Sequence, residues 1–263
     1  MNEQSVRVTF VQSIVDFFVV IFIIEETFMI KKTKNKSEDT INGIVPLLII
    51  DSGNISNIGL FHGKMGVILF FAHYGRFTGD KLYDKFAGKL LDEIYEDITT
   101  EIPVNLENGL CGIGWGVEYL VQGGFMKGNT DDILEEIDHR IMERDPRRIR
   151  DISFRNGLGG IAYYVLARLI AKRQTDQFAF DSTYIRDLQK ALAMSDLQKD
   201  KENPDNLVQD INKYLSGQMN LPYELKLPTV LIDKSPNKII KRTNMPLGII
   251  DGLSGYGLKN MKL

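Results

Sequence analysis

The sequence predicts an all-α protein of helical hairpin repeats, for which a ring explains the glycines better than a helical bundle or a solenoid. Two observations predict this class: a glycine-rich motif recurs at nearly regular intervals, and helical patterns fill the stretches between its copies. Evidence for strands is confined to residues 227–233, LPTVLID, which the flanking prolines mark as a short strand or an extended loop.

The glycine motif occurs in four copies: NIGLFHGKMG, ENGLCGIGWG, RNGLGGIAYY and IDGLSGYGLK. Their Gly-Leu pairs begin at Gly59, Gly109, Gly157 and Gly252, which gives spacings of 50, 48 and 95 residues. The last spacing is about twice the others, so we expect a further copy near residue 205 that has diverged or been replaced by a loop. Such a period is typical of repeats built from one supersecondary unit each.

Each repeat is expected to hold two helices of different character. A uniformly apolar run follows each glycine motif, whereas residues 81–98 have apolar side chains at helical spacing on one face. Similar amphipathic helices are predicted for residues 131–142, with Thr130 as N-cap, and after Asp181. A ring with apolar helices inside and amphipathic helices outside explains the glycines, which allow tight turns at one mouth and close helix packing.

Composition excludes several classes of protein. The 32 basic residues nearly balance the 35 acidic ones, giving a net charge of −3, so a nucleic-acid partner is not expected. The single cysteine, Cys111, excludes an intramolecular disulfide and a multi-cysteine zinc knuckle. These counts favour a protein of a reducing compartment, and a cytoplasmic location is predicted.

The N-terminus contains an unbroken apolar run, FFVVIFII, at residues 17–24. Acidic residues flank it on both sides, and a membrane span needs about 20 mostly apolar residues. A buried helix or strand is therefore favoured, with a membrane segment near residues 10–30 or a signal peptide as alternatives. The lysine-rich stretch that follows is interpreted as a solvated linker.

Two regions are predicted on this basis. Residues 1–40 form an apolar N-terminal segment and basic linker, and residues 41–263 form the toroid domain.

The motifs GLFHGKMG, GLCGIGWG, NGLGGIAYYVLARL and DGLSGYGL resemble the glycine repeats of the lanthionine synthetase C-like (LanC-like) family. The resemblance covers residues 55–258 and implies an α/α toroid. At about 48 residues per repeat the chain holds between five and six hairpins, whereas the family ring has seven. The resemblance therefore implies an incomplete ring and a divergent or truncated member.

The resemblance also implies a chemistry. Family cyclases add a cysteine thiol across a dehydroalanine or dehydrobutyrine of a ribosomally made peptide, using zinc held by two cysteines and one histidine. His62 matches the histidine of the family's glycine repeat and is the acid/base candidate. Cys111 is the candidate metal ligand, but Gly112 follows it and the chain has no second cysteine, so the zinc site is incomplete.

Four further residues are candidates for binding substrate. Trp115 and Tyr256 follow glycines at the expected mouth, where aromatic rings stack on ligands. Glu107 and Asp251 belong to glycine motifs and are placed to line the same mouth, as carboxylates do in toroid glycoside hydrolases. His73, in the apolar run FFAHYG, is interpreted as a core or rim histidine.

Three functions remain open. The first is modification of a ribosomally made peptide by thioether cyclisation or a degenerate version of it, with His62 in acid/base chemistry. The second is a non-catalytic peptide-binding scaffold on the same toroid, whose partners are a precursor peptide and other peptide-modifying enzymes. The third is a toroid enzyme that acts on carbohydrate, which requires Glu107 or Asp251.

Overall fold

The computed structural model describes residues 41–171, 179–218, 224–238 and 245–261. The chain divides into two compact units after Asn54, whereas the sequence predicts a boundary after residue 40. In the first unit, α3 (Val45–Ser52) begins with a proline in its first turn. The apolar run at residues 17–24 lies outside the described residues, and no described helix has the length and apolar character needed to cross a membrane.

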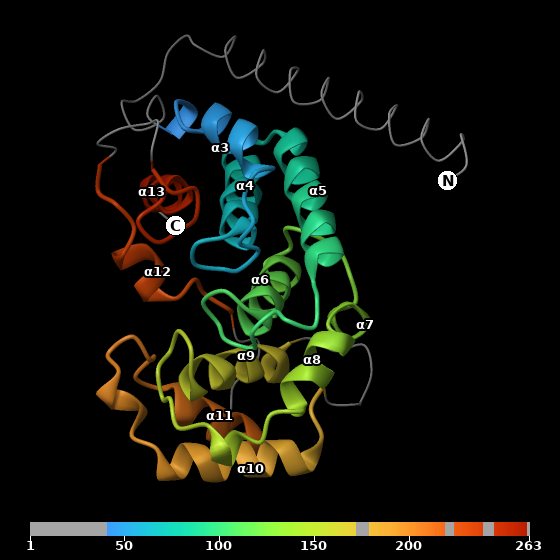
Figure 1. The fold of residues 1–263 in the computed structure, drawn as a ribbon, viewed down its shortest axis with the longest axis vertical. Coiled ribbons are helices and arrows are strands. Elements are labelled where there is room, and N and C mark those ends of the chain that lie inside the picture. Colours follow the sequence, from blue (N-terminus) through green and yellow to red (C-terminus); the bar gives the residue numbers. More distant parts are fainter. Residues whose placement is uncertain (1–40, 172–178, 219–223, 239–244, 262–263) are drawn as a thin grey trace, which may run out of the picture. The chain divides into compact units, whose positions relative to one another are not determined.

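All regular secondary structure of the described residues is helical, which confirms the all-α class (Figure 1). The second unit, residues 55–263, contains α4 (Lys64–Thr78), α5 (Lys81–Asp97), α6 (Leu110–Gln122), α7 (Thr130–Ile133), α8 (Glu135–Met142), η1 (Pro146–Arg148), α9 (Leu158–Ile170), α10 (Ser182–Met194), η2 (Leu197–Lys199), α11 (Leu207–Leu215), α12 (Thr229–Asp233) and α13 (Leu253–Asn260). The prediction of a strand or extended loop at residues 227–233 is wrong, because this stretch forms α12 after Pro228.

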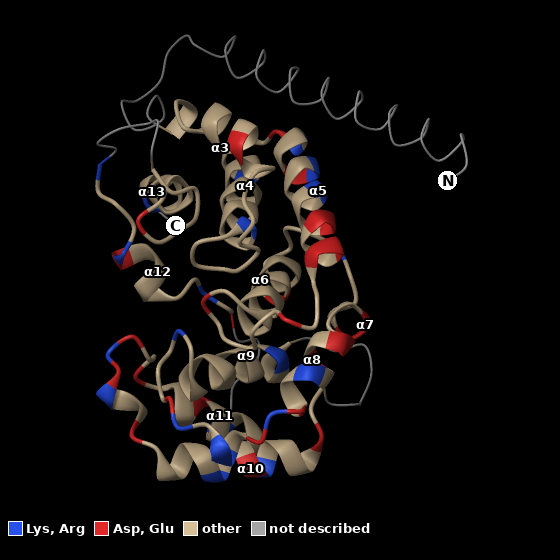
Figure 2. Ribbon diagram, in the orientation of Figure 1, with Lys and Arg blue, Asp and Glu red and all other residues tan. Residues whose placement is uncertain are grey.

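The helices that follow the glycine motifs form the core of this unit. Nearly every residue of α4, α6, α9 and α13 is buried, except toward their C-terminal ends. They pack in the order α13, α4, α6, α9, so the last glycine helix lies beside the first. The glycine-free α11 packs on α9 and occupies the place expected for the missing repeat. Figure 2 shows few charges on α4, α6 and α9 and many on α5 and α10.

The amphipathic helices α5 and α10 agree with the sequence prediction. Asp80 is the N-cap of α5, where its side chain accepts a hydrogen bond from the Leu82 amide, and Asp181 is the N-cap of α10, where it accepts from the Tyr184 amide. Helix α5 packs along α4 (Figure 1). Its buried residues are the apolar ones at helical spacing: Tyr83, Phe86, Ala87, Leu90, Leu91 and Ile94.

The helix predicted for residues 131–142 is interrupted. Leu134 leaves the helical conformation (φ −103°, ψ 5°) and separates α7 from α8. The N-cap is Asn129, whose side chain accepts from the Asp131 amide, and Thr130 is already helical. Thr130 is also buried, and its hydroxyl lies 3.4 Å from the carboxylate of Glu118, so tertiary contacts set this helix start.

A buried ionic cluster joins α6, α7, α8 and α9. The Arg168 guanidinium is fully buried and donates to Asp138 (2.8 and 3.0 Å), Glu118 (2.9 Å) and Asp131 (3.2 Å). The Tyr164 hydroxyl donates to Asp138 as well (2.6 Å). Although burial works against the charge, the hydrogen bonds to Asp138 keep the pKa of Arg168 raised, so the guanidinium stays charged.

The glycine motifs share one backbone register, which corrects the alignment made from sequence. Each helix is capped by an extended glycine, and these are Gly63, Gly109, Gly157 and Gly252. In every copy the amide after this glycine donates at 2.8 Å to the carbonyl seven residues earlier. The first copy is therefore aligned at Gly63 and not at Gly59, and the first spacing is 46 residues rather than 50.

In this register the residues two positions before each capping glycine are equivalent, and their backbones form one row. The Ile250 amide donates to the Phe61 carbonyl, the Phe61 amide to Glu107, and the Glu107 amide to Arg155, all at 3.0 Å. The row continues differently, because the Phe154 amide donates to the Asp200 carboxylate at 2.7 Å. A side chain thus replaces the backbone contact that a fifth glycine motif would make.

In the first three copies, the third residue after the capping glycine receives an apolar side chain from the neighbouring motif. A Cβ atom at Gly66 would lie 2.9 Å from Ile249, one at Gly112 2.9 Å from Leu60, and one at Gly160 2.7 Å from Leu106. Only glycine permits this approach. Because Ile249 packs on Gly66, the last motif contacts the first as its neighbours contact each other.

Candidate functional site

A chain of ion pairs runs across the glycine loops at the N-terminal ends of the core helices. His62 Nε2 lies 3.1 Å from Glu107 Oε1, and Arg155 Nη1 donates to the same oxygen at 3.0 Å. Arg155 also holds Glu202 through two hydrogen bonds of 2.6 and 3.1 Å. Lys234, at the end of α12, lies 3.2 Å from Glu202. We call His62, Glu107, Arg155, Glu202 and Lys234 the loop network.

The contacts at this end of the unit form a closed circuit, because backbone hydrogen bonds connect Lys234 with the loop that contains His62. The Asp251 amide lies 3.3 Å from the Lys234 carbonyl, and its neighbour Ile250 donates to Phe61, next to His62. Charges stabilise the circuit: hydrogen bonding to Glu202 raises the pKa of Arg155, and Arg155 lowers the pKa of Glu202.

The loop network brings together two of the residues singled out in the sequence. The side chain of His62 is 37% exposed and accessible to a ligand, whereas that of Glu107 is 13% exposed. A histidine oriented by a carboxylate can accept or donate a proton, which suits the acid/base role predicted for His62. Arg155 was not singled out, although RNGLGG places it in the motif at the position equivalent to Glu107.

The other predicted site residues are not part of the His62–Glu107 pair, although Asp251 belongs to the adjacent last glycine loop. Cys111 is fully buried in α6, where burial first and the Asp138 charge second raise the pKa of its thiol well above the usual value. Trp115 is also fully buried and stacks on Tyr119. Tyr256 is 8% exposed, and Asp251 is exposed with a left-handed backbone (φ 52°).

Metal-ligating residues do not gather in the described part of the chain, where no group of three or more histidine, cysteine or acidic side chains is close enough to hold an ion. The fully buried Cys111 thiol and His62 of the loop network belong to different surroundings. Among the described residues, a zinc site of the family's kind therefore has no visible set of ligands.

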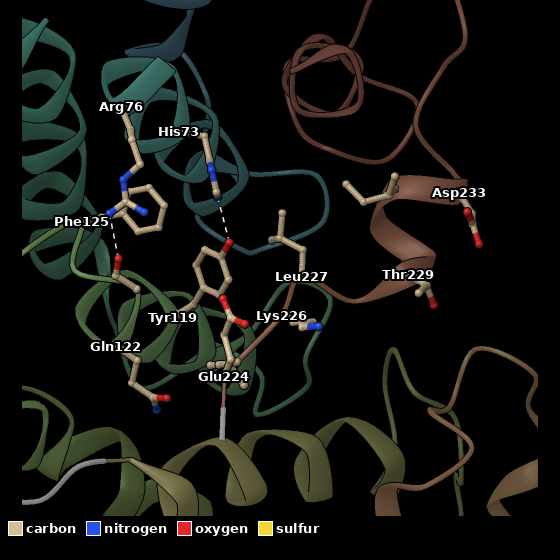
Figure 3. A pocket seen from close by; sticks show the side chains of 13 residues that line it. His73, Arg76, Tyr119, Gln122, Phe125, Glu224, Lys226, Leu227, Thr229 and Asp233 are labelled. Carbon is tan, nitrogen blue, oxygen red and sulfur yellow. Dashed lines mark hydrogen bonds between the residues drawn. The ribbon is translucent and has the colours of Figure 1, made fainter. Parts of the chain in front are cut away.

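A pocket of about 820 Å³ opens near the C-terminal ends of α4 and α6 (Figure 3). His73 lies nine residues along α4 from Lys64, about 14 Å from the glycine loops along the helix axis. Helix α12 and the segment before it form the facing wall. The lining residues are His73, Arg76, Tyr119, Gln122, Gly123, Phe125, Glu224, Leu225, Lys226, Leu227, Thr229, Ile232 and Asp233.

His73 and Tyr119 form a hydrogen-bonded pair on the pocket wall, with 2.9 Å between Nε2 and the hydroxyl oxygen (Figure 3). Burial, and then the positive charge of Arg76, lowers the pKa of His73 to about 4. Burial also raises the pKa of Tyr119 to about 12. Both groups are uncharged at neutral pH, so they offer a neutral hydrogen-bonding edge.

Sequence reasoning missed this pocket. His73 was interpreted as a core or rim histidine, and it is 7% exposed, but Arg76, Tyr119 and Phe125 were not singled out. The signal in the sequence is an arginine, Arg76, near the C-terminal end of a largely apolar helix. The facing wall comes from residues 224–233, more than a hundred positions downstream, which no local pattern connects with α4.

Comparisons of this chain with protein-family models, with curated proteins and with solved structures gave no match.

Proposed function

We propose that this protein is a peptide-binding α/α toroid of the LanC-like kind, which holds a ribosomally made peptide at the glycine-loop end without zinc-dependent cyclisation. The role fits a scaffold that presents a precursor peptide to other modifying enzymes. The peptide contacts the exposed edge of His62 in the loop network.

The observation that carries this proposal is the circuit of contacts among the glycine loops. Four motifs share one register, and the last contacts the first both through Ile250 and Phe61 and through Ile249 and Gly66. Lys234 and Glu202 connect the remaining side, where the glycine motif is missing. An arrangement in which the first and last repeats are neighbours supports a toroid over an open solenoid.

The case against cyclisation rests on the thiolate-binding metal that the family chemistry needs. Zinc that activates a substrate thiol requires deprotonated cysteine and neutral histidine ligands in one place. Cys111 is buried in α6 with its thiol pKa raised, and it is the only cysteine of the sequence. Peptide binding needs none of these ligands, and the His62–Glu107 pair supplies a polar, accessible contact for it.

A peptide with one dehydroalanine and one cysteine separates binding from cyclisation. We expect the dye-labelled peptide to bind, as measured by fluorescence anisotropy, and its thiol to remain fully reactive to iodoacetamide after incubation with the protein. His62→Ala should weaken binding about tenfold, because an accessible hydrogen-bonding group is lost. His139→Ala is the matched control, since His139 is an exposed histidine of α8.

Two results would overturn the proposal. Loss of the free thiol only in the presence of protein would show cyclisation, and equal binding by the wild type and His62→Ala would remove the loop network from the site. Zinc analysis adds an independent readout, for which we expect well under one atom per chain. Stoichiometric zinc that disappears in Cys111→Ser would restore the cyclase hypothesis.

A further inference from the structure

The pocket contains an arginine whose side chain is held in a fixed position. The guanidinium carbon of Arg76 lies 3.6 Å from the centroid of the Phe125 ring, and Nη2 donates to the Gly123 carbonyl at 2.7 Å (Figure 3). Stacking and one hydrogen bond together orient the planar group. An arginine oriented in this way loses little conformational freedom when it binds a ligand.

The remaining donors of Arg76 face a site without a carboxylate partner among the described residues. No described acidic side chain lies within ion-pair distance of Arg76, although Glu224 and Asp233 line the same pocket. By contrast, Arg155 and Arg168 each bind at least two carboxylates. A preorganised guanidinium with free donors is suited to two parallel hydrogen bonds with a carboxylate.

The other residues that line the pocket indicate which kind of molecule the carboxylate belongs to. Leu225, Leu227 and Ile232 provide apolar surface, and Figure 3 shows Leu227 between Tyr119 and α12. Gln122 adds an amide oxygen, since its nitrogen already donates to Glu118 and to the Ala167 carbonyl, and Thr229 adds a hydroxyl. An alkyl chain offers no hydrogen-bond partner to the Gln122 oxygen or the Thr229 hydroxyl, whereas a peptide backbone offers amide donors to both.

The segment that carries the leucines is itself anchored. The Tyr163 hydroxyl of α9 donates to the Lys226 carbonyl at 3.2 Å, which fixes residues 224–227 opposite α6. The volume of about 820 Å³ lies within the range of about 300–1,000 Å³ usual for ligand sites and accommodates several residues of a chain.

We propose that this pocket binds the free C-terminus of a peptide that ends in apolar residues. Arg76 binds the terminal carboxylate, the leucine and isoleucine side chains of the wall contact the last residues, and Gln122 and Thr229 bind the backbone. The inference does not depend on the proposed function, because it concerns a different end of the core helices and requires neither His62 nor Glu107.

The test uses the full chain and a fluorescein-labelled hexapeptide ending in two leucines, made with either a free C-terminal carboxylate or a C-terminal amide. Anisotropy titrations should show binding of the acid that is at least about tenfold tighter than that of the amide. Arg76→Gln should remove the difference between the two peptides. Arg148→Gln is the matched control, since the Arg148 side chain is 88% exposed and lies outside the pocket.

Equal affinity of the acid and the amide for the wild type would overturn the inference, and this comparison needs no variant to fold. Unchanged binding of the acid by Arg76→Gln would also overturn it. Decanoate, added as a competitor, tests whether the carboxylate belongs to an alkyl chain or to a peptide. Displacement of the peptide by equimolar decanoate would assign the pocket to alkyl acids instead. If the pocket still prefers the acid to the amide but His62→Ala does not change binding of the dehydroalanine peptide, only the proposed function is contradicted.

Discussion

The two ends of the core helices are joined in different ways. At the N-terminal ends, neighbouring repeats meet through backbone hydrogen bonds and through glycines that admit a side chain from the next loop. At the C-terminal ends they meet through side chains, such as His73 with Tyr119, Gln122 with the Ala167 carbonyl, and the Arg168 cluster. The first end is closely packed, and the second contains a pocket of about 820 Å³.

Backbone contacts and side-chain contacts differ in how strongly they depend on residue identity. A backbone contact depends little on which side chain a residue carries, so the glycine loops can repeat while Phe61, Glu107 and Arg155 vary at one equivalent position. Side-chain contacts leave gaps whose shape depends on each residue. The end joined by side chains therefore contains the pocket, whereas the loop end presents the exposed side chain of His62, on which the proposed peptide binding rests.

Removal of Arg168 should cause the largest loss of stability at the C-terminal ends of the core helices. Arg168→Leu should lower the free energy of unfolding by about 3–5 kcal/mol, because Glu118 and Asp138 would remain buried without a counter-charge. Urea unfolding monitored by circular dichroism measures the change. A companion variant that also carries Glu118→Gln and Asp138→Asn should recover part of the loss. A cost below about 1 kcal/mol would mean that the cluster does not hold this end together.

Acid should weaken the same end through His73. The unfolded histidine binds a proton near pH 6.5, but the folded one does so only near pH 4, so the unfolded state takes up more protons between these values. The contribution is present above pH 6.5 and is lost as the pH falls toward 4, up to about 3 kcal/mol. Urea titrations at pH 7 and pH 4.5 should show a fall that His73→Gln reduces. An identical fall in the variant would place the effect elsewhere.

The glycine end should respond to the smallest added group. Gly112→Ala should destabilise the protein by about 1–3 kcal/mol, because its Cβ would lie 2.0 Å from the Leu106 carbonyl and 2.9 Å from Leu60. Gly88→Ala is the matched control, since nothing lies within 4 Å of a Cβ atom at this helical position. That change should stabilise α5 by about 0.5–1 kcal/mol. Equal thermal shifts in the two variants would contradict the close approach of the loops.

The sequence predicted the helices whose determinants are local. Helices α5 and α10 have an aspartate N-cap and a one-sided apolar pattern, and both begin where these signals stand. The glycine motifs likewise mark the starts of α6, α9 and α13. In the first motif two glycines compete, and only the hydrogen bond from Lys64 to the Asn57 carbonyl identifies Gly63 as the cap.

The features that the sequence did not predict depend on contacts between residues far apart along the chain. The break at Leu134 accompanies the burial of Thr130 near Glu118, and the candidate site at the loops pairs His62 with Glu107 through two different repeats. The sequence named both residues of that pair but not their contact. Trp115 was expected at the mouth, yet its side chain is fully buried, because the glycine pattern does not indicate which side of α6 is covered.

The contact between Ile249 and Gly66 can form only late in protein synthesis, after α13 has left the ribosome. During synthesis α4 leaves the ribosome long before its neighbour α13, and at about 5–20 residues per second the wait is roughly 10–40 s. One flank of α4 stays uncovered during this interval, and a nascent chain with exposed apolar surface is a substrate for chaperones. The same long-range closure predicts slow refolding in vitro, because loop entropy is lost before the contact forms.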